Sequence, residues 1–373
     1  MRLTKCDVMT SYRSLEQPAI FYSDILKYAI GGKNMRHIGV DLHTNSFTAC
    51  YLQEGKPEHI QTFRLKDLDN FTKDLQETDE VAIEATGNSC FFYDAVSPYV
   101  KRIVIIAPGQ FEVVRRSVNK TDKHDARAIA FFLSKDMLPE ARCKNKQCQQ
   151  LASLLQTRDQ LVKSRVSLIN KVHGLFNYHG IKIKKEVLTT KVGFERATQK
   201  HNWDPLEKVE IEVISYHLEA IRESLKKLEK EIIAFAKQLP GFSNLIGIKG
   251  IGPISAAVFI VTIGDINDFR RPEKLTAYFG VVPRVSQSNQ QCTIGRITKR
   301  GSKIARTSLV QCTWIAVRYS PYLKSFYEHI KKKRGSAKAI TATARKFLIT
   351  IFYTLKNNWV FKDFTKFEIS IGQ

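Results

Sequence analysis

Four carboxylates are the residues of this sequence best suited to metal-assisted chemistry. Asp41 and Glu84 each end a short apolar stretch typical of a β-strand, and Asp122 and Asp125 stand three residues apart. That spacing places both side chains on one face of a helix. Hard oxygen ligands suit Mg²⁺ or Mn²⁺ rather than zinc. Such ions can activate an attacking oxygen and stabilise the leaving oxygen of a phosphodiester.

Each of these acids also has a purely structural interpretation. An Asp at a strand end is commonly a turn residue, and the segment 122–125 could be an N-cap and first helical turn. The order and spacing of all four acids favour one shared site over four separate caps. His43 and His124 flank the acids. We interpret these histidines as phosphate contacts or surface residues rather than as metal ligands.

A serine among cations is the second candidate for chemistry. Ser286 and Ser288 lie in a polar loop, 285–291, that follows Pro283. A hydroxyl there could attack phosphorus while neighbouring cations offset the developing negative charge. The alternative is a polar hairpin tip whose serines face water. The candidate phosphate-binding cations are Arg284, Arg296, Lys299, Arg300 and Arg306.

Closely spaced glycines predict a further phosphate contact. Gly250 and Gly252 lie in the segment 245–253, which precedes an apolar helical stretch, 254–263. Glycine lets backbone N–H groups approach a phosphate at a helix N-terminus, in a contact that is independent of base sequence. We therefore expect a helix-hairpin-helix here; the alternative is a plain glycine-rich turn.

The composition indicates a polyanionic partner. Lys and Arg number 59 against 36 Asp and Glu, which gives the 373-residue chain a net charge of +23. Such a field attracts nucleic acid. The 7 cysteines are scattered without a CxxC pair, which argues against a disulfide framework or a zinc ribbon. With no long apolar run and no secretory signal pattern, we expect a cytoplasmic protein without a membrane span.

The periodicity predicts an α/β fold followed by α structure. Strands are expected at 37–41, 46–52, 60–65, 80–84 and 102–107, and helices at 68–75, 91–100 and 122–133. This alternation predicts a mixed sheet flanked by helices. Two long amphipathic stretches, 148–182 and 205–238, predict an antiparallel coiled-coil arm joined by a basic connector, or else an ordinary bundle.

These patterns divide the chain into five parts, each expected to have its own role. The predicted parts are an N-terminal extension at 1–34, the acid-bearing domain at 35–145, the helical arm at 146–238, a mainly helical domain with the glycine and serine motifs at 239–335, and a basic helical tail at 336–373.

The first strand also allows a different function. The segment 38–44 resembles the phosphate loop of actin-like ATPases and sugar kinases. Those folds need a second phosphate loop and a glycine-rich adenosine site in a later lobe, whereas the later region here is helical and basic. This difference disfavours an ATPase.

Taken together, the motifs resemble the DEDD-type insertion-sequence transposases, the bridge-RNA-guided recombinases related to pilin-gene invertases. The matching segments in the first half are 39–41, 83–87 and 120–126. In the second half they are 250–253, 279–284 and 297–301. All six occur in the order of the family.

The resemblance implies an RNase H-like (RuvC-like) domain, a coiled-coil arm and a C-terminal transposase domain with a serine nucleophile. It places the metal-binding acids at Asp41, Glu84, Asp122 and Asp125. The family's serine precedes a glycine, whereas Ser288 here precedes Asn289. Its spacing to the flanking motifs nevertheless favours Ser288, with Ser286 as the alternative nucleophile.

The implied activity is DNA transposition through a serine–DNA covalent intermediate, assisted by Mg²⁺ or Mn²⁺ and guided by a structured non-coding RNA. The resemblance also implies a bacterial, nucleoid-associated protein that forms dimers and then tetramers with its DNA. Two alternatives remain open. One is a RuvC-like, structure-selective endonuclease (a junction resolvase) that uses the acids alone, and the other is a nucleic-acid-binding protein without catalysis.

Overall fold

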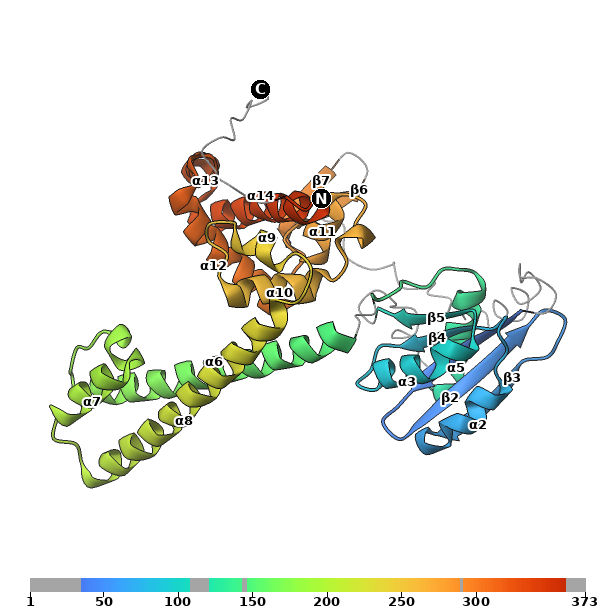
Figure 1. Ribbon diagram of the computed structural model, residues 1–373, viewed down its shortest axis with the longest axis horizontal. Coiled ribbons are helices and arrows are strands. Elements are labelled where there is room, and N and C mark those ends of the chain that lie inside the picture. Colours follow the sequence, from blue (N-terminus) through green and yellow to red (C-terminus); the bar gives the residue numbers. More distant parts are fainter. Residues whose placement is uncertain (1–34, 108–120, 143–145, 289–290, 360–373) are drawn as a thin grey trace, which may run out of the picture. The chain divides into compact units, whose positions relative to one another are not determined.

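The computed structural model describes residues 35–107, 121–142, 146–288 and 291–359. The predicted N-terminal extension and the last part of the predicted tail lie outside these ranges. The chain divides into two compact units, residues 1–143 and 144–373 (Figure 1). Each unit has its own hydrophobic core. Among the described residues, no helix is both long and apolar enough to cross a membrane.

The first unit is built on one five-stranded mixed sheet with the strand order β3-β2-β1-β4-β5. The central strand β1 pairs antiparallel with β2 and parallel with β4, and β4 pairs parallel with β5. The predicted mixed α/β sheet is confirmed, and its order is consistent with an RNase H-like domain. The strands are β1 Arg36–Leu42, β2 Ser46–Gln53, β3 His59–Arg64, β4 Glu80–Glu84 and β5 Arg102–Ile106.

Helices cover this sheet and bury its apolar side chains. Phe47 of β2 lies at the centre of an aromatic cluster, with ring centroids 5.1 Å from Phe63, 5.2 Å from Phe71 and 5.1 Å from Phe92. Offset and edge-to-face packing of this kind adds to the stabilisation from burial. The helices are α2 Leu68–Asp74, α3 Ser89–Val96 and α5 Asp122–Ser134, with short 3₁₀ turns η1 Leu65–Asp67 and η2 Ser97–Tyr99.

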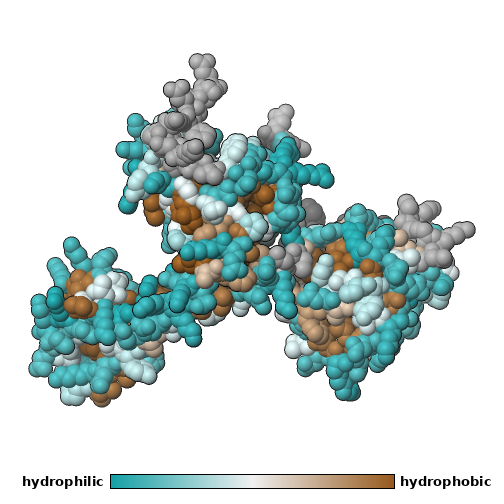
Figure 2. Space-filling model, viewed as in Figure 1, coloured by the Kyte–Doolittle hydropathy of each residue, from teal (hydrophilic) through white to brown (hydrophobic). Residues whose placement is uncertain are grey.

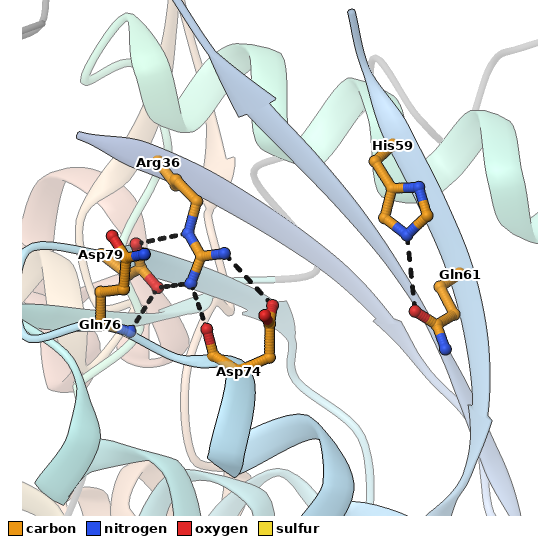
Figure 3. Close-up of polar contacts among 6 residues, drawn as sticks. All are labelled: Arg36, His59, Gln61, Asp74, Gln76 and Asp79. Carbon is orange, nitrogen blue, oxygen red and sulfur yellow. Dashed lines mark hydrogen bonds and ion pairs between the residues drawn. The ribbon is translucent and has the colours of Figure 1, made fainter. Parts of the chain in front are cut away.

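An ion-pair network fixes the start of β1 (Figure 3). Arg36 donates from Nε to Asp79 Oδ1 at 2.9 Å and from Nη2 to Asp79 Oδ2 at 2.6 Å, and its Nη1 lies 3.2 Å from Asp74 Oδ2. The hydrogen bond with Asp79 raises the pKa of Arg36. Asp79 is fully buried and also accepts from the backbone N–H of Gln76. This bidentate ion pair joins β1 to the turn before β4.

We expect Asp79→Ala to destabilise the protein by about 3 kcal/mol, because it leaves the mostly buried Arg36 without its main counter-charge. Urea denaturation followed by circular dichroism measures this loss. Glu77→Ala, at an exposed position in the same turn, is the matched control and should change stability by less than about 0.5 kcal/mol. Equal stability of the two variants would contradict a structural role for the network.

Two long helices form an arm in the second unit (Figure 1). α6, Lys146–Tyr178, packs against α8, Pro205–Ala236. At one end of the arm, Leu151 and Ile232 join the main core of the unit. At the other end, Phe176 and Trp203 belong to a separate core.

The basic connector between the arm helices is itself folded. It contains η3, Lys185–Thr189, and α7, Lys191–Gln199. Phe194 of α7 is buried beside the arm helices. The sequence pattern did not predict α7, because a nine-residue helix with one buried aromatic shows little periodicity.

The rest of the second unit is mainly helical and packs around the apolar helix α10. Residues 336–373 are predicted to form a basic helical tail, but Phe347 and Leu348 of α14 are fully buried in the same core as α10. The described part of that segment is therefore a core helix. The elements are α9 Phe242–Ile246, α10 Pro253–Ile263, η4 Ile266–Asp268, α11 Pro272–Tyr278, β6 Pro283–Ser288, β7 Gln291–Ile297, α12 Lys303–Tyr319, α13 Pro321–Arg334 and α14 Ser336–Lys356.

Candidate functional site

Parallel pairing of β1 with β4 places two acids at one edge of the sheet. Val40 is in register with Ile83, so the following residues, Asp41 and Glu84, are neighbours. The strands run in the same direction, and both acids therefore come from carboxyl ends of strands. Asp41 is 7% exposed and Glu84 is partly exposed.

The start of α5 supplies the other two acids. Thr121 caps the helix, since its hydroxyl accepts from the His124 backbone N–H at 3.2 Å. Asp122 and Asp125 therefore lie in the first turn, where the helix dipole favours negative charge. The helix can approach β1 closely because Gly39 has no side chain: a Cβ there would lie 2.2 Å from the Ala126 carbonyl oxygen.

The four acids share one electrostatic environment. The pKa of Asp41 is raised from 3.8 to about 6, mainly by burial and further by the negative charges of Asp122, Asp125 and Glu84. His43 acts in the opposite direction. Like charges held this close disfavour full ionisation unless a cation compensates them. The oxygen-rich donor set and its mutual repulsion both fit a hard divalent cation.

His43 is also part of this cluster. Its Nε2 lies 3.3 Å from Asp41 Oδ2 and 3.3 Å from Asp122 Oδ1. One ligand atom from each of these three residues lies within 4.8 Å of the other two. Asn88, which the sequence analysis missed, donates from Nδ2 to the His43 carbonyl oxygen at 2.8 Å. In the sequence, only the position of Asn88 between β4 and α3 indicates that it lies near this edge.

The predicted serine loop is largely a β-hairpin. β6 and β7 pair antiparallel, with Ser286 in register with Thr293 and Ser288 with Gln291. The loop prediction was wrong for 285–288 and for Gln291 because polar residues on a two-stranded ribbon give no apolar alternation. Ser286 is exposed, while the side chain of Ser288 lies outside the described part of the chain.

Two close backbone approaches fix the base of the hairpin. Gly280 has a φ of +67°, and a Cβ on it would lie 2.2 Å from the Arg300 carbonyl oxygen. Lys299 donates its backbone N–H to the Gly280 carbonyl oxygen at 3.1 Å. The exposed Lys299 and Arg300 are thereby held next to the hairpin, as are the exposed Arg284 and Arg296 on its strands.

Arg306 has a structural role in the same region. Its Nη1 donates to the carbonyl oxygens of Arg300 at 2.6 Å and Gly301 at 3.0 Å. Burial lowers the pKa of Arg306. Its guanidinium thus ties α12 to the base of the hairpin, and a phosphate contact by Arg306 stays a prediction.

The two predicted phosphate-binding glycines differ in their surroundings. Gly250 has a φ of +104°, and a Cβ on it would lie 2.8 Å from the Cys312 carbonyl oxygen, so it allows the close packing of α12. Gly252 is exposed, caps α10 and has no atom within 4 Å of an added Cβ. The N-terminus of α10 is therefore open at Gly252, whereas Gly250 is packed against α12.

Comparison with known proteins relates both units to transposases. A transposase family model of the DEDD IS110 type matches residues 38–179, and the model of the transposase IS116/IS110/IS902 family matches residues 243–328. The first match includes the acidic edge, and the second includes the hairpin.

Individual relatives agree with these matches. The transposase for insertion sequence element IS1111A of Coxiella burnetii is 27% identical, and the alignment covers 84% of this chain and 88% of that protein. The transposase for element IS1328 of Yersinia enterocolitica is 26% identical, with 78% and 86% covered. The pilin gene-inverting protein of Moraxella bovis is 24% identical, with 86% and 95% covered. The chain belongs to the DEDD-type insertion-sequence transposases.

Proposed function

We propose that this transposase cuts and rejoins DNA by transesterification, with the acidic edge of the sheet as its metal-dependent catalytic site. The observation that carries the proposal is the buried Asp41, whose pKa is raised to about 6 by burial and further by the nearby negative charges of Asp122, Asp125 and Glu84. Burying a carboxylate beside like charges costs stability, and such strain is typical of functional sites. In a DNA-binding protein of charge +23, four neighbouring carboxylates would repel the DNA unless a bound cation compensated their charge.

The four acids would hold Mg²⁺ or Mn²⁺. The ion, when bound, supplies charge stabilisation to a phosphodiester and lowers the cost of bringing DNA to a carboxylate cluster. The protein contributes the geometry: β1 and β4 fix Asp41 and Glu84, and the capped first turn of α5 fixes Asp122 and Asp125. A rigid donor set of this kind keeps its ligands in place before DNA binds.

The serine hairpin would supply the nucleophile. The Ser288 Oγ would attack a DNA phosphorus and give up its proton, an Oγ–P bond would form, one P–O bond to deoxyribose would break, and the leaving oxygen would take up a proton. A second DNA hydroxyl then attacks the same phosphorus and releases the serine. One phosphodiester replaces another, so no external energy source is needed. Arg284, Arg296, Lys299 and Arg300 would offset the charge that develops on the phosphate.

A structured non-coding RNA would guide the protein to its DNA sites, as the family resemblance implies. The net charge of +23 supports binding of nucleic acid in general. Sequencing of RNA that copurifies with the full-length protein tests it. An RNA with two loops complementary to the donor and target DNA supports guidance, and a protein that recombines DNA after complete RNA removal contradicts it.

Ser288→Ala is expected to reduce strand exchange by at least about 10³-fold, because it removes the nucleophile rather than a contact. The assay uses the full-length protein with donor and target DNA and Mg²⁺, and DNA binding is measured in parallel. Thr293→Val, at a neighbouring hydroxyl of the same hairpin, is the control and should retain exchange. Ser286→Ala separates the two candidate serines.

Full activity of both serine variants would contradict this part of the proposal and favour the alternative, a RuvC-like endonuclease that uses the acids alone. Cleavage without rejoining in the wild-type protein would point to the same alternative.

We also propose that the protein assembles as a homo-oligomer, a dimer that pairs into a tetramer on DNA, through an exposed stripe on α8. Leu206, Val209, Val213 and Tyr216 are 84%, 58%, 51% and 75% exposed. Their spacing of three and four residues places them on one face of the helix, as in a helix pairing with a second copy. Figure 2 shows hydrophobic residues at the surface of the end of the arm where α8 begins.

Val213→Glu is expected to lower the mass measured by sedimentation at a fixed protein concentration, because a charge would be buried in the contact. Ser224→Glu adds the same charge at an exposed position further along α8 and should leave the mass unchanged. An unchanged mass for both variants would exclude this stripe as the contact.

A further inference from the structure

The position of His43 adds a nitrogen donor to a site otherwise made of oxygen donors. Its Nε2 lies 3.3 Å from carboxylate oxygens of both Asp41 and Asp122. We propose that His43 is a direct ligand of the divalent metal, which makes this a mixed nitrogen-and-oxygen site with a preference for Mn²⁺ over Mg²⁺. This inference rests on the proposed metal site and goes beyond the four acids.

The distances fit neighbouring ligands of one ion. In an octahedral site with bonds of about 2.1 Å, adjacent ligand atoms are separated by about 3 Å. The two separations from His43 Nε2, each 3.3 Å, are close to that edge length. An ion can therefore be placed between the three residues with only small side-chain movements, because all three donor atoms already lie within 4.8 Å of one another.

The backbone around His43 holds it at this position. The turn after β1 closes with the His43 N–H donating to the Ser46 carbonyl oxygen at 2.9 Å. Asn88 Nδ2 donates to the His43 carbonyl oxygen at 2.8 Å and to that of Thr44 at 3.3 Å. These bonds join the His43 turn to the segment that follows Glu84. The backbone that carries the imidazole is thus held between β1 and the segment after β4, as suits a preorganised ligand.

The orientation and exposure of the side chain also suit a ligand. The Nε2 faces the carboxylates, and when it binds the metal the Nδ1 would carry the proton of the neutral ring. The imidazole is 49% exposed and Asp122 is 60% exposed, so this side of the site is open to water or to a DNA phosphate. A metal held here would keep positions for substrate.

An imidazole changes which metal the site prefers. Mg²⁺ favours oxygen ligands and retains its waters, whereas Mn²⁺ stands above it in affinity for sites that include nitrogen. Loss of the imidazole should therefore weaken Mn²⁺ binding more than Mg²⁺ binding. If carboxylates alone bound the metal, replacing His43 would leave the affinities for both Mn²⁺ and Mg²⁺ unchanged.

The test measures metal binding by the full-length protein without DNA. Titration calorimetry gives the affinities for Mn²⁺ and Mg²⁺ in wild type, His43→Gln and a control, His59→Gln. His59 is an exposed histidine on β3 that hydrogen-bonds Gln61 (Figure 3). We expect His43→Gln to lose about 10-fold or more in Mn²⁺ affinity, with a smaller loss for Mg²⁺ and no loss in the control.

A spectroscopic measurement on the wild-type protein does not depend on any variant. Pulsed electron paramagnetic resonance of bound Mn²⁺ should show the hyperfine coupling of one directly bound imidazole nitrogen, and histidine labelled with ¹⁵N should change that coupling. Mn²⁺ bound with oxygen donors alone would overturn the proposal and indicate that His43 only pairs with the acids or with phosphate. Equal Mn²⁺ affinity of His43→Gln and wild type would overturn it as well.

Failure of this inference can be told apart from failure of the metal site itself. Asp41→Asn should lose binding of both metals if the acidic edge is the site. If wild type binds Mn²⁺ through oxygens and Asp41→Asn does not, only the role of His43 is wrong. If wild type binds neither metal, the metal site and the role of His43 fall together.

Discussion

Asp41→Asn is expected to abolish strand exchange and at the same time to stabilise the metal-free protein at neutral pH. Burial and the neighbouring carboxylates raise the pKa of Asp41 from 3.8 to about 6. The folded state therefore disfavours the ionised form. Because a shift of one pKa unit corresponds to 1.36 kcal/mol, ionisation at pH 7 costs up to about 3 kcal/mol of stability, which the neutral amide avoids.

The direction of the pH dependence follows from this shift. The protonated carboxyl is favoured in the folded state, so its contribution is fully present below about pH 4 and is lost as the pH rises through about 6. Asp41→Asn should thus exceed wild type in stability at pH 7, and the difference should disappear near pH 4. Urea denaturation at the two pH values in EDTA measures it.

A matched variant and added metal sharpen this prediction. Asp69→Asn, at an exposed position on α2, should show no such pH-dependent gain. Mg²⁺ should raise the melting temperature of wild type but not of Asp41→Asn, because a ligand that binds only the folded state stabilises it. A variant that is less stable than wild type at pH 7 in EDTA would contradict the electrostatic interpretation of the site.

Gly39→Ala is expected to disrupt both stability and activity. A Cβ on Gly39 would lie 2.2 Å from the Ala126 carbonyl oxygen and 2.2 Å from the Ala130 backbone nitrogen. Because both are backbone atoms of α5, the whole helix must shift. We expect a loss of about 1 to 3 kcal/mol in stability. A shift of about 1 Å in Asp122 and Asp125 should lower strand exchange by about 10²-fold.

The control for this variant is Gly174→Ala, within α6, where an added Cβ meets no atom within 4 Å. That change should be neutral or slightly stabilising, because Ala is the better helix former. If Gly39→Ala bound Mn²⁺ and exchanged strands as wild type does, α5 would not need its close approach to β1, and the explanation of how Asp122 and Asp125 are positioned would be wrong.

The acidic edge was accessible to sequence reasoning because its signals are local. Asp41 and Glu84 end strands whose apolar runs are visible in the sequence, and carboxyl ends of adjacent parallel strands meet at one edge. Asp122 and Asp125 follow a capping threonine. What the sequence did not contain was the pairing of β1 with β4, which had to be assumed from the fold class.

Contacts between segments distant in sequence were not accessible in this way. Gly250 was predicted to contact phosphate from the spacing of the glycines, and Arg306 from its place near the serines. The structure adds that Gly250 allows the approach of α12 and that Arg306 binds backbone carbonyls at the base of the hairpin. Asn88 reaches His43 across 45 positions of the chain. Such tertiary partners leave no periodic trace, so pattern reasoning could identify the residues but not their roles.

We expect formation of a serine–DNA bond to require the metal site proposed at the acidic edge. Trapping that intermediate tests it most directly. Full-length protein is incubated with donor DNA and Mg²⁺, quenched with denaturant, digested with trypsin and analysed by mass spectrometry for peptides that carry a nucleotide. We expect an adduct on Ser288 in wild type, and none in Asp41→Asn, in Ser288→Ala or in EDTA. Recombinant DNA products from Ser288→Ala, or an adduct that forms equally well in EDTA, would contradict it.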